Sequence, residues 1–357
     1  ILGALYMIAP MALRARLAAG RADWVAFWSW TIGVVGMVSH FWIDQISGMV
    51  WAAAMVILTL AFLGGRVALV LRPAPIARGV KLHFVLAFVN IVAAGTFGGL
   101  IGLNKLVPVL PGFVLTNVYA HAHLAGVGWA LMTVMGAAYR LLPMLLPAQL
   151  PGGARVAVSA VLVEVGVVGL FAGLHLRSAL VAPSALVVIA GIGAFLTTVG
   201  WMRAHRRRPA KGLPRPDLGV IQVFVALAYL VLAAGLGLAL AAAPEAAWKV
   251  TVAGVYGVVA LLGFLGQMIV GVNLRLFPLF AWLHLAQDGR IPSSPQRFSS
   301  PGRAVTVTLP WNLAVPMLVV ALFVGAASLA WSAGLLLLVA TVASVALQRS
   351  TLARLRP

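Results

Sequence analysis

Four histidines are the side chains of this sequence whose types and positions favour metal chemistry. His121 and His123 stand two residues apart at the start of one apolar run, while His40 and His175 stand near the ends of two others. A neutral imidazole is a good ligand for copper, iron and zinc. We therefore predict that a metal would bind to His121, His123, His175 and His40.

The spacing of His121 and His123 restricts how they could act together. Residues two apart on an α-helix point about 200° away from each other, so these two imidazoles serve different faces of their helix. Two interpretations follow. In the first, the pair supplies ligands to two neighbouring centres, or one ring binds a centre while the other makes a structural hydrogen bond. In the second, both rings bond to backbone carbonyls at a polar helix start.

Glu164 is the one acidic residue in the middle of an apolar run. A charge at that depth in a bilayer costs several kcal/mol, so we expect this carboxyl to be protonated or paired. One interpretation is a proton relay, and the other is a neutral carboxyl bonded to a neighbouring helix. We do not predict ligand roles for His83, His205 and His284, which stand near basic residues or at a helix end.

The composition indicates which kind of secondary structure must position these side chains. Hydrophobic residues make up 63% of the chain and charged residues only 9%, which leaves too little polar surface for a water-soluble globule of 357 residues. The apolar runs exceed the length of a barrel strand, and a lipid-facing backbone must satisfy its own hydrogen bonds. The sequence therefore predicts an all-α polytopic membrane protein embedded in a lipid bilayer.

Ten apolar segments are long enough to cross a membrane. They cover residues 24–43, 47–71, 83–103, 117–143, 155–176, 179–202, 218–243, 247–281, 309–328 and 331–348. Residues 1–10 indicate the tail of a further helix, so we expect about a helix and a half to precede the given residues. We predict a single transmembrane domain over 1–357, with a polar loop at 287–303.

The basic residues alternate between the connections of these segments. Of the 25 Lys and Arg residues, 22 fall in every second connection and at the C-terminus, and 3 fall in the others. Positive residues collect on the cytoplasmic side of membrane proteins, so we predict cytoplasmic basic loops in a bacterial-type inner membrane. Because this pattern explains the net charge of +19, nucleic acid is not an expected partner.

An internal repeat recurs at the ends of three segments. It has the form Gly-x-x-Tyr/Leu-x-x-x-Pro, begins at Gly3, Gly136 and Gly271, and is spaced by 133 and 135 residues. A second echo relates 84–95 to 224–235. These similarities indicate successive groups of four helices.

Three groups of four helices resemble the plan of the haem–copper oxidase subunit I superfamily. The run from His121-Ala-His123-Leu to Tyr139 and Leu-Leu-Pro143 is similar to the haem-ligating helix of B-type oxidases, and also to nitric-oxide reductases and NnrS-like membrane proteins. The resemblance implies about 12 transmembrane helices in the full-length protein, ten complete and one partial here, in a pseudo-threefold bundle. It also implies a cofactor near the outer face, either haem bound to His121 and His123 or copper with His121 or His123 and His175 as ligands.

The function implied is redox, electron-transfer or nitric-oxide-related chemistry in a respiratory chain, together with other membrane subunits. The sequence departs from the oxidases at Tyr256 and Val258, which replace the two histidines of the tenth helix, so reduction of oxygen to water is not expected. Whether the chain is itself an enzyme stays open. The alternative is a cofactor-free structural or accessory subunit of a larger complex. A transporter is less favoured because the repeat is parallel and not inverted.

Overall fold

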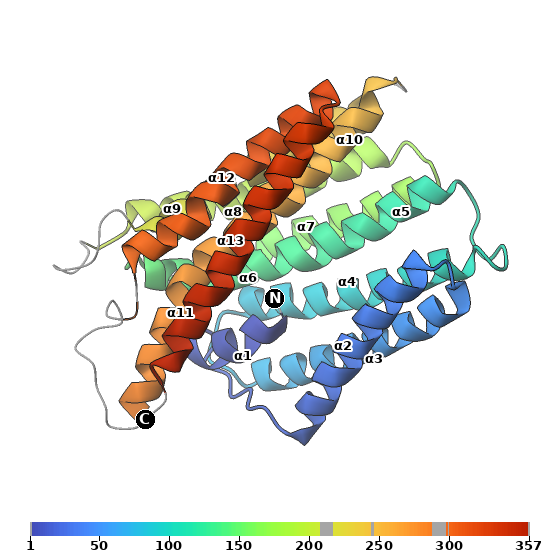
Figure 1. The fold of residues 1–357 in the computed structure, drawn as a ribbon. Coiled ribbons are helices and arrows are strands. Elements are labelled where there is room, and N and C mark those ends of the chain that lie inside the picture. The colour runs from blue at the N-terminus through green and yellow to red at the C-terminus, as the bar shows by residue number, and fades with distance from the viewer. Residues whose placement is uncertain (1, 208–216, 244–245, 288–297, 299, 356–357) are drawn as a thin grey trace. The chain divides into compact units, whose positions relative to one another are not determined.

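The computed structural model describes residues 2–207, 217–243, 246–287, 298 and 300–355, and all regular elements within these ranges are helices. Ten of the described helices are long and apolar enough to cross a membrane. Large apolar side chains such as Trp24, Leu58, Val165 and Leu335 are exposed along them, as expected for a surface that contacts lipid. The chain is a multi-pass helical membrane protein (Figure 1).

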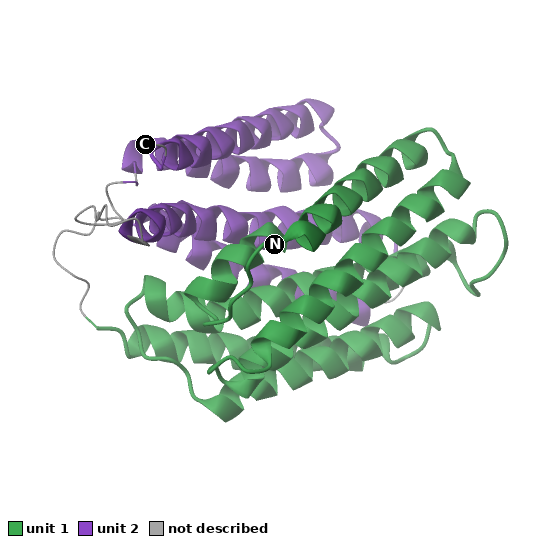
Figure 2. Cartoon of the chain, turned by 90° about the horizontal axis from the view of Figure 1, so that it is seen from below, with its two compact units in different colours: residues 1–207 green, residues 208–357 purple. Residues whose placement is uncertain are grey.

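The helices form two compact units, residues 1–207 and 208–357 (Figure 2). Unit 1 contains α1 (Leu2–Met11), α2 (Arg21–Trp42), α3 (Ile46–Leu71), α4 (Arg78–Leu103), α5 (Val114–His123), the π-helix η1 (Leu124–Leu131), α6 (Met132–Leu145), α7 (Gly153–His175) and α8 (Val181–Ala204). The segments α5, η1 and α6 follow each other without a break and form one span.

Unit 2 contains α9 (Leu218–Ala242), α10 (Trp248–Val258), the π-helix η2 (Val259–Gly266), α11 (Gln267–Gln287), α12 (Pro301–Val324) and α13 (Ala327–Ala353). Here α10, η2 and α11 form one continuous span. The single transmembrane domain over 1–357 stays a prediction.

Each of the ten predicted segments corresponds to one of these spans, with boundaries that shift by several residues. The largest shift is in α12, which begins at Pro301 where we predicted residue 309. Proline fits the first turn of a helix because its missing N–H is not needed there. Most of the predicted polar loop 287–303 lies outside the described residues, and its last three residues belong to α12.

Close packing between neighbouring spans depends on small residues. In the α7–α8 pair, a Cβ atom on Gly166 would lie 2.7 Å from the backbone nitrogen of Val188, and one on Gly191 would lie 2.9 Å from that of Val163. Glycine at these positions lets the two helix backbones approach closely without hydrogen bonds between polar side chains.

A buried ion pair joins the first three helices. Arg66 of α3 forms a salt bridge with Asp23 of α2, and the hydroxyl of Tyr6 in α1 donates to Asp23 Oδ1 at 2.5 Å. The N–H of Gly20 donates to the other oxygen of Asp23 at 2.7 Å. This cluster, which has no signature in the local sequence, satisfies a buried carboxylate at the start of α2.

Units 1 and 2 share a feature that supports the internal repeat. The π-helices η1 and η2 each contain 8 residues, and Leu124 and Val259 begin them 135 positions apart, the same spacing as Gly136 and Gly271. In each unit the preceding long helix packs against the π-helix, α4 against η1 and α9 against η2. The two units therefore contain the same arrangement of a helix against an interrupted helix.

The glycine contacts give the register of this arrangement. Gly98 faces His121 in unit 1 and Gly237 faces Tyr256 in unit 2, while Gly128 faces Asn90 and Gly263 faces Tyr229. The α4 and α9 positions differ by 139 residues in both pairs. The sequence echo of 84–95 with 224–235 has an offset of 140, one residue more than the offset of these packing contacts.

Candidate functional site

His121 and His175 bond across helices at one end of unit 1, where α4 and α7 finish and α5 begins. The Nδ1 atom of His121 lies 2.8 Å from the carbonyl oxygen of Ala94 in α4. The Nδ1 atom of His175 lies 2.7 Å from Asn117 Oδ1 in α5. Asn117 precedes His121 by four residues, so both side chains stand on the same face of α5. The three helices α4, α5 and α7 thus meet around these two imidazoles.

The hydrogen-bond partners determine the tautomer of each ring. A carbonyl oxygen can only accept, so His121 Nδ1 carries the hydrogen. The Nδ2 group of Asn117 donates to the carbonyl of Pro111 at 3.1 Å, which directs Asn117 Oδ1 as an acceptor toward His175. Each neutral imidazole therefore has its lone pair on Nε2. This is the arrangement found in metal-binding histidines, where a second hydrogen bond orients the ring.

Adjacent residues of α4 contact the two imidazoles. A Cβ atom on Gly98 would lie 2.8 Å from Cε1 of His121, so the absence of a side chain there makes space for the ring. Phe97 meets the ring of His175 edge-on at 5.4 Å between centroids. Phe171, one turn before His175 in α7, stacks on it at 5.9 Å. These aromatic contacts restrict the orientation of His175.

His123 and His40 occupy other positions. Nδ1 of His123 lies 2.8 Å from the carbonyl of Tyr119 in its own helix, and Nδ1 of His40 lies 2.7 Å from the carbonyl of Gly36 in its own helix. The ring of His40 packs over Gly48 of α3. His121 and His123 thus bond to different partners. Both partners are backbone carbonyls, as expected from the interpretation in which the two rings bond to backbone carbonyls at a polar helix start.

The four predicted ligands do not form one group. Among the residues that the structure describes, no cluster of three or more His, Cys, Asp or Glu side chains is placed to hold a metal ion. A centre that uses His121 and His175 would take its remaining ligands from solvent, from a porphyrin or from another subunit. The donor chemistry of these two imidazoles fits copper or haem iron, while a four-histidine site is not present in the described part of the chain.

Glu164 pairs with an amide near the middle of unit 1. Asn90 Nδ2 donates to Glu164 Oε2 at 2.7 Å and to the carbonyl of Leu86 at 3.0 Å. Asn90 is buried, and a Cβ on Gly128 of η1 would lie 2.6 Å from its Cγ. The carboxyl group of Glu164 in α7 is therefore hydrogen-bonded to Asn90 in α4, beside the π-helix η1.

A second polar cluster, which the sequence analysis missed, lies further toward the other end of α4. The Ser159 hydroxyl lies 3.3 Å from His83 Nε2 and 2.7 Å from the Tyr139 hydroxyl. All three side chains are fully buried. His83 Nδ1 also lies 2.7 Å from the carbonyl of Gly79, so both nitrogens of His83 have partners. This histidine serves packing and hydrogen bonding and has no lone pair left for a metal.

Within the described part of the chain, two buried polar atoms of the span α5–η1–α6 have no hydrogen-bond partner. They are the indole Nε1 of Trp129 in η1 and the hydroxyl of Thr133, one turn later in α6. Polar atoms left in this way cost free energy unless a small molecule such as water reaches them. A π-helix widens the turn and is often found at functional sites. The span that carries His121 therefore has both a widened turn and unsatisfied polar groups.

The corresponding span of unit 2 has no imidazole before its π-helix, since its one histidine, His284, lies near the end of α11, and it has a different polar cluster. Asn312 of α12 donates to Gln222 Oε1 at 3.0 Å, and Gln267 donates to Asn312 Oδ1 at 3.0 Å. The indole of Trp311 donates to the carbonyl of Leu262 in η2 at 3.1 Å. In this unit neutral amides and an indole lie near the π-helix, and Gln267 Oε1 is a further buried polar atom without a hydrogen-bond partner among the described residues. The widened turn and the unsatisfied polar atoms thus occur in both units, and what distinguishes unit 1 is its pair of cross-helix histidines, His121 and His175.

The other two histidines lie outside these clusters. His205 follows α8, bonds to the carbonyl of Trp201 at 2.9 Å and stacks on its indole. His284, near the end of α11, stacks on Phe280 at 6.3 Å. Neither contributes to the site at α4, α5 and α7.

Comparisons of the chain with family models, with curated proteins and with solved structures find no match in any of the three.

Proposed function

We propose that this protein is a haem–copper-oxidase-like membrane protein, and that Nε2 of His121 and of His175 bind a copper-type metal ion or haem iron. One observation carries the proposal: both rings bond through Nδ1 to a partner on another helix, which leaves each Nε2 lone pair available. The metal would supply electron transfer or nitric-oxide-related redox chemistry.

The residues of the chain have separate roles in this proposal. The Ala94 carbonyl and the Asn117 amide orient the two ligands, and Phe97 and Phe171 exclude water beside His175. Glu164, held by Asn90, stores or passes a proton at Oε1 or Oε2. The proposed helix plan is the pseudo-threefold bundle of about 12 helices.

The charge pattern supports an orientation in the membrane. With the basic loops in the cytoplasm, His121 and His175 lie at the opposite face of a bacterial-type inner membrane. A metal at that face would exchange electrons with partners outside the cytoplasm or with other membrane subunits.

The test is an absorption spectrum of the detergent-purified protein, oxidised and reduced, with metal analysis of the same sample. We expect stoichiometric copper or iron in the native protein, and its loss in His121→Ala and His175→Ala. His205→Ala is the matched control, because it removes an imidazole elsewhere and should leave the metal content unchanged. Metal lost equally from all three variants would contradict the assignment of these ligands.

The alternative is a cofactor-free accessory subunit. It is favoured by the absence of a third protein ligand near His121 and His175 among the described residues. A protein with a flat spectrum and no metal, which keeps its melting temperature and co-purifies with other subunits, would support this alternative and reject the metal site.

A further inference from the structure

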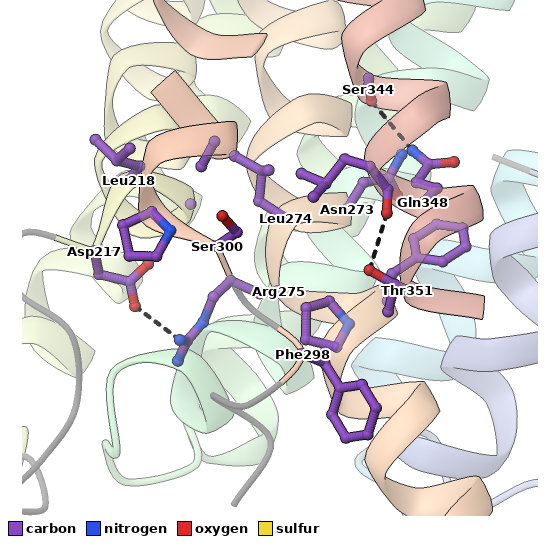
Figure 3. Close-up of a pocket in the computed structure, with 16 residues that line it drawn as sticks. Asp217, Leu218, Asn273, Leu274, Arg275, Phe298, Ser300, Ser344, Gln348 and Thr351 are labelled. Atoms are coloured by element: carbon purple, nitrogen blue, oxygen red, sulfur yellow. Dashed lines mark hydrogen bonds and ion pairs between the residues drawn. The ribbon is translucent and has the colours of Figure 1, made fainter. Parts of the chain in front are cut away.

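A cavity of about 60 Å³ lies inside unit 2, among the first turns of α9 and α12, the middle of α11 and the last turns of α13 (Figure 3). One water molecule needs about 10–15 Å³ measured in this way, so the space holds a group of about five non-hydrogen atoms. A phosphate group has this size. The cavity is separate from the histidine site, which belongs to unit 1.

The wall of the cavity is polar on one side and apolar on the other. Its polar side chains include Asp217, Arg275, Ser300 and Gln348, and its apolar ones include Leu218, Phe277 and Phe298. The amide of Gln348 also donates to Ser344 Oγ at 3.2 Å. The Ser300 side chain precedes α12 without capping it, so its hydroxyl is not used by the helix end. A ligand that fits both walls has a polar head joined to an apolar part.

Most described charged side chains near the cavity are basic. Of those that line it, Asp217 and Arg275 have opposite charges, and three further arginines, at positions 303, 349 and 354, stand at the same helix ends without lining it, which gives 4 − 1 = +3. Asp217 is already engaged, because its Oδ2 lies 3.0 Å from Arg275 Nη1 and its Oδ1 accepts from the N–H of Val220. Arg303 of α12 donates to the neutral hydroxyl of Ser350 at 3.4 Å, next to the lining residue Thr351.

We propose that this cavity binds the phosphodiester headgroup of an anionic phospholipid. Arg275 and Arg303 attract the phosphate, Ser300 and Gln348 donate to its oxygens, and the apolar wall contacts the glycerol and ester region. The cavity lies at the helix ends that carry the basic residues, which is the level of lipid headgroups. A soluble phosphate would leave the apolar wall without a partner.

The experiment uses the full chain, stripped of lipid in detergent, and then mixed with phosphatidylglycerol or with zwitterionic phosphatidylcholine. Native mass spectrometry counts bound lipids and thermal melting measures their effect. We expect phosphatidylglycerol to raise the melting temperature by about 4 °C or more above phosphatidylcholine. Arg303→Gln should weaken phosphatidylglycerol binding about fivefold, because a positive charge beside the cavity is lost.

A second variant tests the space without a change in charge. Ala304→Leu fills the cavity from α12 and keeps a good helix former, so it should also abolish the preference for phosphatidylglycerol. Arg21→Gln, at the exposed start of α2, removes one positive charge from the same predicted membrane side and should bind lipid as the native protein does.

Three results would overturn the proposal. Equal stabilisation by both lipids would show that no anionic headgroup is recognised. Native-like lipid binding in Arg303→Gln and Ala304→Leu would place the lipid elsewhere. The same stabilisation by inorganic phosphate alone would identify a soluble anion as the ligand. None of these results depends on metal at His121, so failure of the lipid site and failure of the metal site are distinguishable.

Discussion

Gly98 of α4 faces the ring of His121 so closely that a Cβ atom there would lie 2.8 Å from Cε1 and 3.0 Å from Nδ1. The same ring bonds to the carbonyl of Ala94, one turn earlier in α4. The backbone of α4 thus positions the imidazole, through the carbonyl of Ala94 and through the space left by Gly98, which has no side chain.

Gly98→Ala should displace the imidazole of His121 and destabilise the protein by about 1–3 kcal/mol, the usual cost of overpacking. Gly99→Ala is the control, because its Cβ would lie at an ordinary 3.9 Å from Ile57 Cδ1. Thermal melting in detergent compares the two variants, and metal content reports the ligand. Equal stability of both variants would show that Gly98 does not position His121.

Asn117→Leu should weaken metal binding about 10–100-fold, which is the usual effect of removing the hydrogen bond that orients a ligating histidine. The reason is that Asn117 Oδ1 holds the Nδ1–H group of His175. Metal titration measures the change. Thr116→Ala is the neighbouring control, since its exposed hydroxyl bonds only to the carbonyl of Phe113. An Asn117→Leu protein with native affinity would remove His175 from the proposed ligand set.

Asn90→Leu should destabilise unit 1 by about 1–3 kcal/mol, because Glu164 would lose its amide donor while remaining partly buried. Glu164→Gln should cost much less, since the new side chain keeps a carbonyl oxygen as acceptor for Asn90. Chemical unfolding in mild detergent compares these variants. A larger loss in Glu164→Gln than in Asn90→Leu would show that the negative charge, and not the hydrogen bond, matters there.

Tyr139→Phe and Ser159→Ala should not act additively. The two hydroxyls bond to each other at 2.7 Å in a fully buried site, so each single change costs about 1 kcal/mol and the double change costs less than the sum. A double-mutant cycle by thermal unfolding measures this coupling energy. Thr341→Val offers a control, because that hydroxyl is exposed and bonds only to its own helix. Strict additivity would contradict the contact.

Trp311→Phe and Trp129→Phe should change the free energy of unfolding by different amounts, or in opposite directions. The Trp311 indole donates to the carbonyl of Leu262, which also accepts from the N–H of Gln267, so its loss removes one of two hydrogen bonds and costs about 1 kcal/mol. Trp129 Nε1 has no partner in the described structure, so Trp129→Phe should be neutral or stabilising. The two melting temperatures decide the point. A strong loss in Trp129→Phe would indicate that water or a ligand normally bonds to this indole.

The helices were predictable because each span is a long apolar run bounded by polar or basic residues, and hydropathy alone locates such runs. The ends of α12 were harder, because Pro301 begins that helix among polar residues. The π-helices could not be foreseen. Their sequences are as apolar as ordinary membrane helices, and the widened turn depends on contacts with α4 and α9.

The site was predictable in part. His121 and His175 could be named as candidates from residue type and helix end, but the bond between His175 and Asn117 joins residues 58 positions apart and depends on tertiary packing. His83 was excluded as a ligand because of its place near Lys81. Its burial with Tyr139 and Ser159 has no signature in the local sequence. The oxidase-like helix plan and the metal stay predictions.

The matched π-helices also record the history of the chain. Units 1 and 2 carry the same widened turn at positions that differ by 135 residues, but an imidazole precedes it in only one of them. A duplicated ancestor that already contained the turn explains this pattern, with the two descendants diverging afterwards at His121 and Tyr256. One descendant would then be free to acquire chemistry while the other kept the inherited scaffold, which is how a duplicated part becomes specialised.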